Sequence, residues 1–185
     1  MKKLLMIAAM FAAAFTVKAQ SEVGTVFLKP HVGINVSNIT DGNGDAKVGL
    51  AAGAELGYQA TETFAVTVAA VYSMQGAKND ELKYNLEYIN IPILANAYLT
   101  KGLAVKVGVQ PAFKTKGEIK PNGSNVTVKD DLVKSFDFSI PIGLSYEFSD
   151  FVFDARYNWG LTKLIDGFDS KNTVFQFTVG YKFGL

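Results

Sequence analysis

An all-β fold, an eight-stranded antiparallel up-and-down transmembrane β-barrel, is predicted from three features of the sequence. Apolar and polar residues alternate over long stretches, which is the period of a strand with two unlike faces. The apolar rows are bulky and carry no charge, whereas the rows between them mix Gly and Ser with single charged residues. Short and long connections alternate, as they do in barrels that cross a membrane.

The alternation is clearest in residues 136–161, FDFSIPIGLSYEFSDFVFDARYNWGL. Before the two-residue turn at Ser149 and Asp150, the apolar row consists of Phe136, Phe138, Ile140, Ile142, Leu144, Tyr146 and Phe148. After the turn it consists of Phe151, Phe153, Ala155, Tyr157, Trp159 and Leu161. We therefore expect a hairpin with lipid on its apolar side and a polar lumen on the other.

The same criterion predicts six further strands, at residues 26–37, 48–58, 64–74, 88–99, 103–113 and 174–183. Strands of this length can cross an apolar band at the usual tilt. Four prolines fall inside them, namely Pro30, Pro92, Pro111 and Pro141. Because each proline removes a donor from the ladder, bulges or water-assisted gaps are expected there.

The connections predict an orientation. Residues 60–63, 100–102 and 149–150 are short turns, whereas the long loops are expected at residues 38–47, 77–85, 114–135 and 164–172. Short periplasmic turns and long outer loops are the rule in Gram-negative outer membranes, and an even number of strands returns the chain to its starting side. We expect an outer-membrane protein with both termini in the periplasm.

Aromatic residues near the strand ends fit this orientation. One girdle, on the periplasmic side, would contain Tyr58, Phe64, Tyr146, Phe148, Phe151, Tyr181 and Phe183. The outer girdle would contain Tyr72, Phe113, Phe136, Phe138, Trp159 and Phe175. A soluble β-sandwich is the alternative fold, but it would need neither aromatics at both ends of its strands nor a polar face so rich in Gly, Ala and Ser.

Residues 1–19 are predicted to be a secretory signal peptide, which leaves residues 20–185 as one barrel domain. Lys2 and Lys3 precede an apolar stretch that is short for a membrane span, and Val17-Lys18-Ala19 resembles a cleavage site. An N-terminal membrane anchor is the alternative. Removal of the segment leaves fifteen basic against seventeen acidic residues. This near-neutral balance and the predicted export argue against a nucleic-acid partner.

Charged side chains at inward positions are expected to fill the lumen, since an eight-stranded barrel is only wide enough for side chains. They are Lys29, His31, Glu55, Lys106, Asp137, Glu147, Asp154, Arg156 and Lys182. Unpaired buried charges are costly, so we expect an ion-pair network. Strand neighbours suggest Glu147 with Arg156 or Lys106, and Asp154 with Lys182. A polar plug is the main interpretation; a narrow proton or ion path, or a gated channel, is the alternative.

Catalytic, cofactor and metal sites are not predicted. The single His, His31, has no Ser or carboxylate at a triad spacing, although a barrel could assemble a triad from several strands. The absence of Cys removes disulfides and thiolate ligands. Asp41, Asn43 and Asp45 alternate like the start of a calcium loop, but no Glu follows at the twelfth position, so a turn is expected.

Several segments resemble the PorT-like family of small outer-membrane β-barrel proteins from Bacteroidetes. They are VGINVSNIT, VYSMQGAK, YINIPILANAYLTKGLAVKVGVQPAF, FDFSIPIGLSYEF, FDARYNWGLT and the terminal VGYKF. The resemblance implies a link to protein secretion through the type IX system, although it carries over no catalytic or ligand residue. Phe183, near the terminus, resembles the aromatic signal that barrel-assembly machinery reads.

Together these features predict a structural, binding or secretion-accessory role through extracellular loops, chiefly residues 114–135. The expected partners are outer-membrane lipid, barrel-assembly machinery during biogenesis, and a secretion-system or extracellular partner. A transport protein with a small pore is the alternative, and an outer-membrane enzyme using His31 is a third class.

Overall fold

The strands of the computed structural model form one antiparallel sheet that closes on itself. The structure describes residues 22–40, 45–78, 82–121, 128–129, 134–163 and 170–185. The strands are β1 (Val26–Ile39), β2 (Asp45–Thr61), β3 (Phe64–Lys78), β4 (Leu82–Asn90), β5 (Ile93–Tyr98), β6 (Leu103–Pro121), β7 (Val128–Lys129), β8 (Phe136–Phe148), β9 (Phe151–Lys163), β10 (Lys171–Tyr181) and β11 (Phe183–Gly184). Within the described residues, no helix is both long and apolar enough to span a membrane.

The wall of the barrel has eight strand positions. β4 and β5 share one position between β3 and β6, and β10 and β11 share another between β9 and β1. β7 pairs only with the distal part of β6. The sheet closes where β1 pairs with β10 as well as with β2. The predicted eight-stranded antiparallel barrel is thus confirmed, and the β-sandwich alternative is wrong because the sheet has no edge.

The two faces of the wall are inverted relative to a soluble protein. In β9, Phe153 and Trp159 are 49% and 50% exposed, while Asp154 and Arg156 between them are 5% and 3% exposed. The other strands alternate in the same way. Large apolar side chains therefore face the surroundings and charged ones face the lumen, an arrangement that suits a lipid solvent.

The four prolines that the sequence places inside predicted strands all border gaps in the ladder, as expected. Pro30 lies beside the break between β10 and β11. Pro92 and Pro111 flank the break between β4 and β5, where the Pro111 carbonyl accepts a hydrogen bond from the Ile91 amide at 2.8 Å. Pro141 faces the unpaired part of β6 next to β8. The missing backbone N–H donors therefore fall where the neighbouring strand has no paired carbonyl to accept them.

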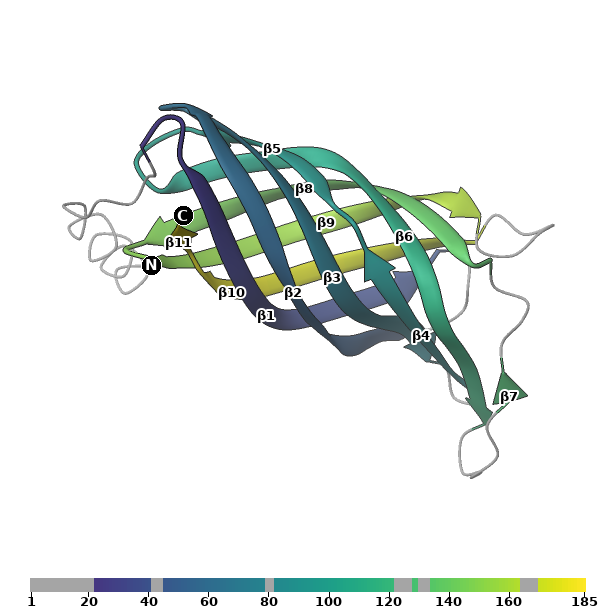
Figure 1. Ribbon diagram of the computed structural model, residues 1–185. Coiled ribbons are helices and arrows are strands. Elements are labelled where there is room, and N and C mark those ends of the chain that lie inside the picture. The colour runs from purple at the N-terminus through teal and green to yellow at the C-terminus, as the bar shows by residue number, and fades with distance from the viewer. Residues whose placement is uncertain (1–21, 41–44, 79–81, 122–127, 130–133, 164–169) are drawn as a thin grey trace, which may run out of the picture.

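The strands extend further than predicted on one side of the barrel. The predicted loop at residues 77–85 contains the end of β3 and the start of β4, and the predicted loop at residues 114–135 contains the last part of β6 and β7. β4 and the distal half of β6 pair from Leu82 opposite Pro121 to Asn90 opposite Ala112. Figure 1 shows this part, with β7, projecting beyond the barrel. We call β4, β7 and residues 114–121 of β6 the strand extension.

The opposite end carries the tight turns. Turns at residues 62–63, 99–102 and 149–150 join β2 to β3, β5 to β6 and β8 to β9. Gly102 and Ser149 adopt positive φ values of 90° and 54° there. β1 begins and β11 ends on this same side (Figure 1). The predicted signal peptide, residues 1–19, lies outside the described residues.

Candidate functional site

The centre of the lumen is filled by an ion cluster from four strands. Lys29 on β1 pairs with Glu55 on β2 at 2.7 Å. Lys106 on β6 reaches Asp154 on β9 at 2.7 Å and Glu55 at 3.6 Å. Arg156 Nε lies 2.7 Å from Asp154 Oδ1. Because Lys106 joins strands that are not neighbours in the sheet, this cluster spans the lumen.

A second cluster closes the lumen nearer the tight turns. Glu147 on β8 accepts hydrogen bonds from the Tyr98 hydroxyl and from Lys182 Nζ, both at 2.7 Å. Lys182 Nζ also lies 4.5 Å from the centre of the Phe27 ring. That ring occupies the space where a side chain at Gly57 would stand, since a Cβ there would lie 2.1 Å from Phe27 Cζ. An aromatic ring and an ion pair therefore occupy this mouth of the barrel.

The structure places all nine of the charged residues selected from the sequence inside the barrel, each at most 9% exposed. Their pairing differs from the expected one. Asp154 pairs with Lys106 and Arg156 rather than with Lys182, and Glu147 pairs with Lys182 rather than with Arg156 or Lys106. The expectation rested on adjacent strands, whereas long lysine side chains reach over an intervening strand.

Two of the nine residues stand apart from both clusters. The His31 Nδ1 donates a hydrogen bond to the Lys29 carbonyl oxygen at 3.3 Å, and its Nε2 makes no hydrogen bond within the described residues. Asp137 lies toward the strand extension, where its Oδ1 accepts a hydrogen bond from the Phe138 amide at 2.8 Å. Neither forms an arrangement of nucleophile, base and carboxylate.

The half of the lumen nearer the strand extension is filled by neutral amides and hydroxyls. Gln176 donates to Asn35 at 3.0 Å, and Asn35 donates to Ser73 at 2.8 Å. Gln75 also donates to Ser73, at 2.7 Å, and accepts from Asn172. This amide layer is not among the features predicted from the sequence. Its signal was available, because Asn, Gln and Ser recur at inward positions of several strands.

Little free space remains where the described side chains of the two ion clusters meet. A cavity of about 10 Å³ lies between the two ion clusters, lined by residues that include Lys29, Glu55, Tyr98, Glu147 and Lys182. That volume is about the room of one water molecule. Among the described residues, this part of the lumen is therefore filled by polar side chains.

A row of polar side chains runs along the strand extension, starting at the lipid-facing surface. The Tyr72 hydroxyl donates to Glu87 Oε2 at 2.7 Å, and Glu87 is opposite Lys116 in the β4–β6 register. Glu118 pairs with Lys116 at 2.8 Å and with Lys120 at 3.4 Å. The hydrogen bond from Lys116 lowers the pKa of Glu118 and raises the pKa of Lys116, so both stay charged near neutral pH.

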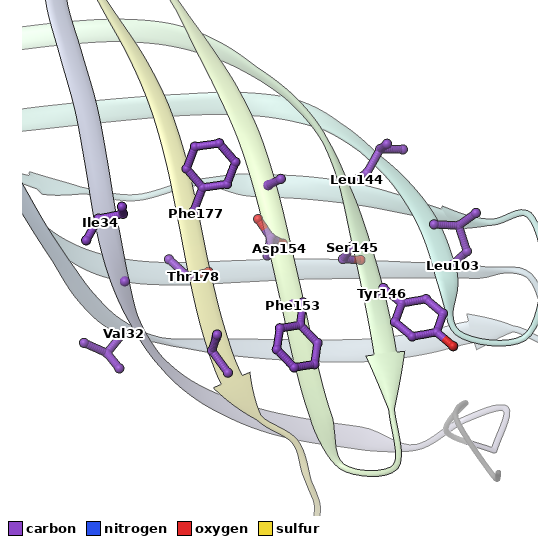
Figure 2. Close-up of a pocket in the computed structure, with 13 residues that line it drawn as sticks. Val32, Ile34, Leu103, Leu144, Ser145, Tyr146, Phe153, Asp154, Phe177 and Thr178 are labelled. Carbon is purple, nitrogen blue, oxygen red and sulfur yellow. The ribbon is translucent and has the colours of Figure 1, made fainter. Parts of the chain in front are cut away.

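A shallow hollow of about 400 Å³ interrupts the apolar outer surface around Ala155. Figure 2 shows Phe153, Phe177 and Leu144 among the side chains around it. Ala155 lies opposite Leu144 on one side and Phe177 on the other, so a small side chain stands between large ones. The lining is mostly apolar, as expected of a surface in contact with hydrocarbon, although Ser145, Asp154 and Thr178 also border the hollow.

Metal ligands do not converge within the part of the chain that the structure describes, where no group of three or more His, Cys, Asp or Glu residues could hold an ion. Asp41 and Asn43 of the calcium-like sequence lie outside the described residues, and Asp45 begins β2.

Comparisons with known proteins agree with the geometry. Residues 12–166 match the family described as "Outer membrane protein beta-barrel domain". Ail, the attachment invasion locus protein of Yersinia pestis, is a similar solved structure, with 15% identity and a TM-score of 0.55 over 88% of this chain and 100% of Ail. Neisserial surface protein A is similar at 14% identity and a TM-score of 0.56, over 85% and 97% of the two chains. No curated protein matched.

Proposed function

The chain belongs to the outer membrane β-barrel domain family, and on this premise we propose that it is a non-catalytic barrel with a plugged lumen that contacts other molecules through its extracellular end. The observation that carries the proposal is the pair of ion clusters, because Lys106 and Glu147 each join strands that are not adjacent. A lumen bound together in this way is suited to supporting the wall rather than to passing solutes.

We propose that the tight turns and both termini face the periplasm and that the strand extension faces outward. The tight turns support this orientation, since barrels of the bacterial outer membrane keep their short connections on the periplasmic side. In this orientation the second ion cluster lies toward the periplasm and the amide layer lies toward the outside.

The partners proposed for the protein are outer-membrane lipid, barrel-assembly machinery during biogenesis, and a secretion-system or extracellular partner at the outward end. The resemblance to the PorT-like family supports an accessory role in secretion. The strand extension supports a binding role, because its paired strands present a surface beyond the barrel (Figure 1).

A narrow pore for ions is the second candidate, since the lumen is lined by charges of both signs around a cavity of about 10 Å³. In planar bilayers we expect the purified protein to show no steady unitary conductance, because paired side chains occupy the lumen. Steady channels that change with Lys106→Met, but not with Lys101→Met at a tight turn, would favour the pore. Heat-modified gel mobility confirms in each case that the barrel is folded.

A further inference from the structure

Three lysines gather on one face of the strand extension. Lys83 is exposed and lies opposite Lys120 in the β4–β6 register. Lys116 lies four residues before Lys120 on β6. The Lys116 and Lys120 side chains are 53% and 45% exposed, and both pair with the single carboxylate of Glu118. Two cations directly opposite each other on neighbouring strands repel, so this face favours an added anion.

Among the side chains that the structure describes, the charge balance of this face is positive. The three lysines face the carboxylates of Glu118 and Glu87, and Glu87 already accepts the Tyr72 hydroxyl. Within the described residues, this excess of positive charge lies next to Tyr72, a lipid-facing aromatic residue of the barrel wall, rather than at a loop remote from the wall.

The height of the lysines above the apolar band limits the partner. Phe113, 51% exposed, marks the outer girdle on β6. With about 3.3 Å of rise per residue and a tilt of about 35–45°, Lys116 lies about 7–8 Å and Lys120 about 16–19 Å beyond it. A phospholipid headgroup layer is only about 5–8 Å deep on each side. The lysines therefore span more than the depth of a phospholipid headgroup.

We propose that Lys83, Lys116 and Lys120 bind the phosphorylated sugar headgroup of a glycolipid in the outer leaflet. The inference rests on the proposed orientation. A sugar headgroup reaches further from the membrane than a phospholipid phosphate, and its phosphate groups supply the anion that the lysine face lacks. The polar row from Tyr72 to Lys120 begins at the lipid-facing wall, which favours a membrane lipid over a soluble polyanion.

The test measures capture of lipopolysaccharide by the purified full-length barrel in phosphatidylcholine nanodiscs. The double variant Lys83→Gln/Lys120→Gln is expected to bind about 30-fold more weakly, as about 1 kcal/mol for each lysine implies. Lys101→Gln, at a tight turn on the opposite end, is the control and is expected to bind like the parent protein. Phosphatase-treated lipopolysaccharide is expected to lose the difference between the parent and the double variant.

A second pair of variants, in which a carboxylate rather than a lysine is neutralised, separates a local site from an effect of net charge. Glu118→Gln frees two lysines and is expected to tighten binding about fivefold, whereas Glu22→Gln makes the same change in net charge near the tight turns and is expected to leave binding unchanged. Heat-modified mobility shows that each variant is folded.

Three outcomes would overturn the glycolipid site. The first is that the double variant binds lipopolysaccharide as tightly as the parent protein does. The second is that millimolar inorganic phosphate competes as well as lipopolysaccharide itself. The third is that a soluble polysulfated glycan binds in preference to lipopolysaccharide. Orientation is measured separately on intact cells, where Ser135→Cys should react with an impermeant maleimide and Thr100→Cys should not. Labelling of Thr100→Cys alone would refute the orientation, while nanodisc binding would still report on the lysines.

Discussion

Replacing Lys106 by methionine is expected to lower the free energy of unfolding by about 3–5 kcal/mol. Lys106 Nζ lies 2.7 Å from Asp154 and 3.6 Å from Glu55, and its side chain is 2% exposed. Methionine is similar in length but has no charge, so Glu55 and Asp154 would keep their negative charges with fewer partners. A buried charge that loses its partner cannot recover its hydration in a filled lumen.

The measurement is unfolding by denaturant in detergent micelles, followed by heat-modified gel mobility. Lys101→Met removes the same type of side chain at an exposed turn and should change the free energy of unfolding by less than about 1 kcal/mol. Similar losses in the two variants would mean that the lumenal ion pairs do not stabilise the barrel.

Replacing Ala155 by arginine is expected to destabilise the folded, inserted barrel by about 2–4 kcal/mol. Ala155 lies midway along β9 between Phe151 and Trp159, which belong to the two aromatic girdles, so its side chain faces the centre of the apolar band. The hollow around it has room for the aliphatic part of arginine, which separates the cost of the charge from a steric clash.

Leu99→Arg is the matched control, because Leu99 is 63% exposed next to a tight turn, at the edge of the band. Near the interface the same charge should cost about 0–1 kcal/mol. Folding into phosphatidylcholine vesicles gives both values. A soluble environment around the wall predicts little effect at either position, and that result would contradict the membrane-spanning arrangement.

The apolar rows could be predicted from the sequence because a strand has a period of two and the outer face meets one uniform solvent. Ile142, Leu144 and Phe153 all satisfy that rule, and their outward placement follows from local pattern alone. The eight wall positions followed from counting these rows.

The pairing inside the lumen could not be predicted in the same way. Which charges meet depends on the stagger of the strands and on side-chain reach, neither of which local periodicity contains. Lys182 meets Glu147 over the intervening β9, and Lys106 meets Glu55 across the lumen. Partners chosen from neighbouring strands were therefore wrong.

The strand extension was missed because the criterion followed contact with lipid rather than hydrogen bonding. Beyond the outer girdle both faces meet polar surroundings, so the apolar row ends while the ladder continues from Phe113 to Pro121. Leu86, buried on the same face of β4 as Tyr88 at the start of the predicted strand, was the available signal for a longer strand in this region.

Fluorescence of Trp159 tests the central claim most directly, since it is the single tryptophan of the chain and its side chain is 50% exposed on the outer face of β9. In bilayers whose acyl chains carry bromine just below the ester groups, strong quenching is predicted, while the water-soluble quencher iodide should have little effect. Efficient quenching by iodide together with no response to brominated acyl chains would contradict a barrel wall in contact with hydrocarbon.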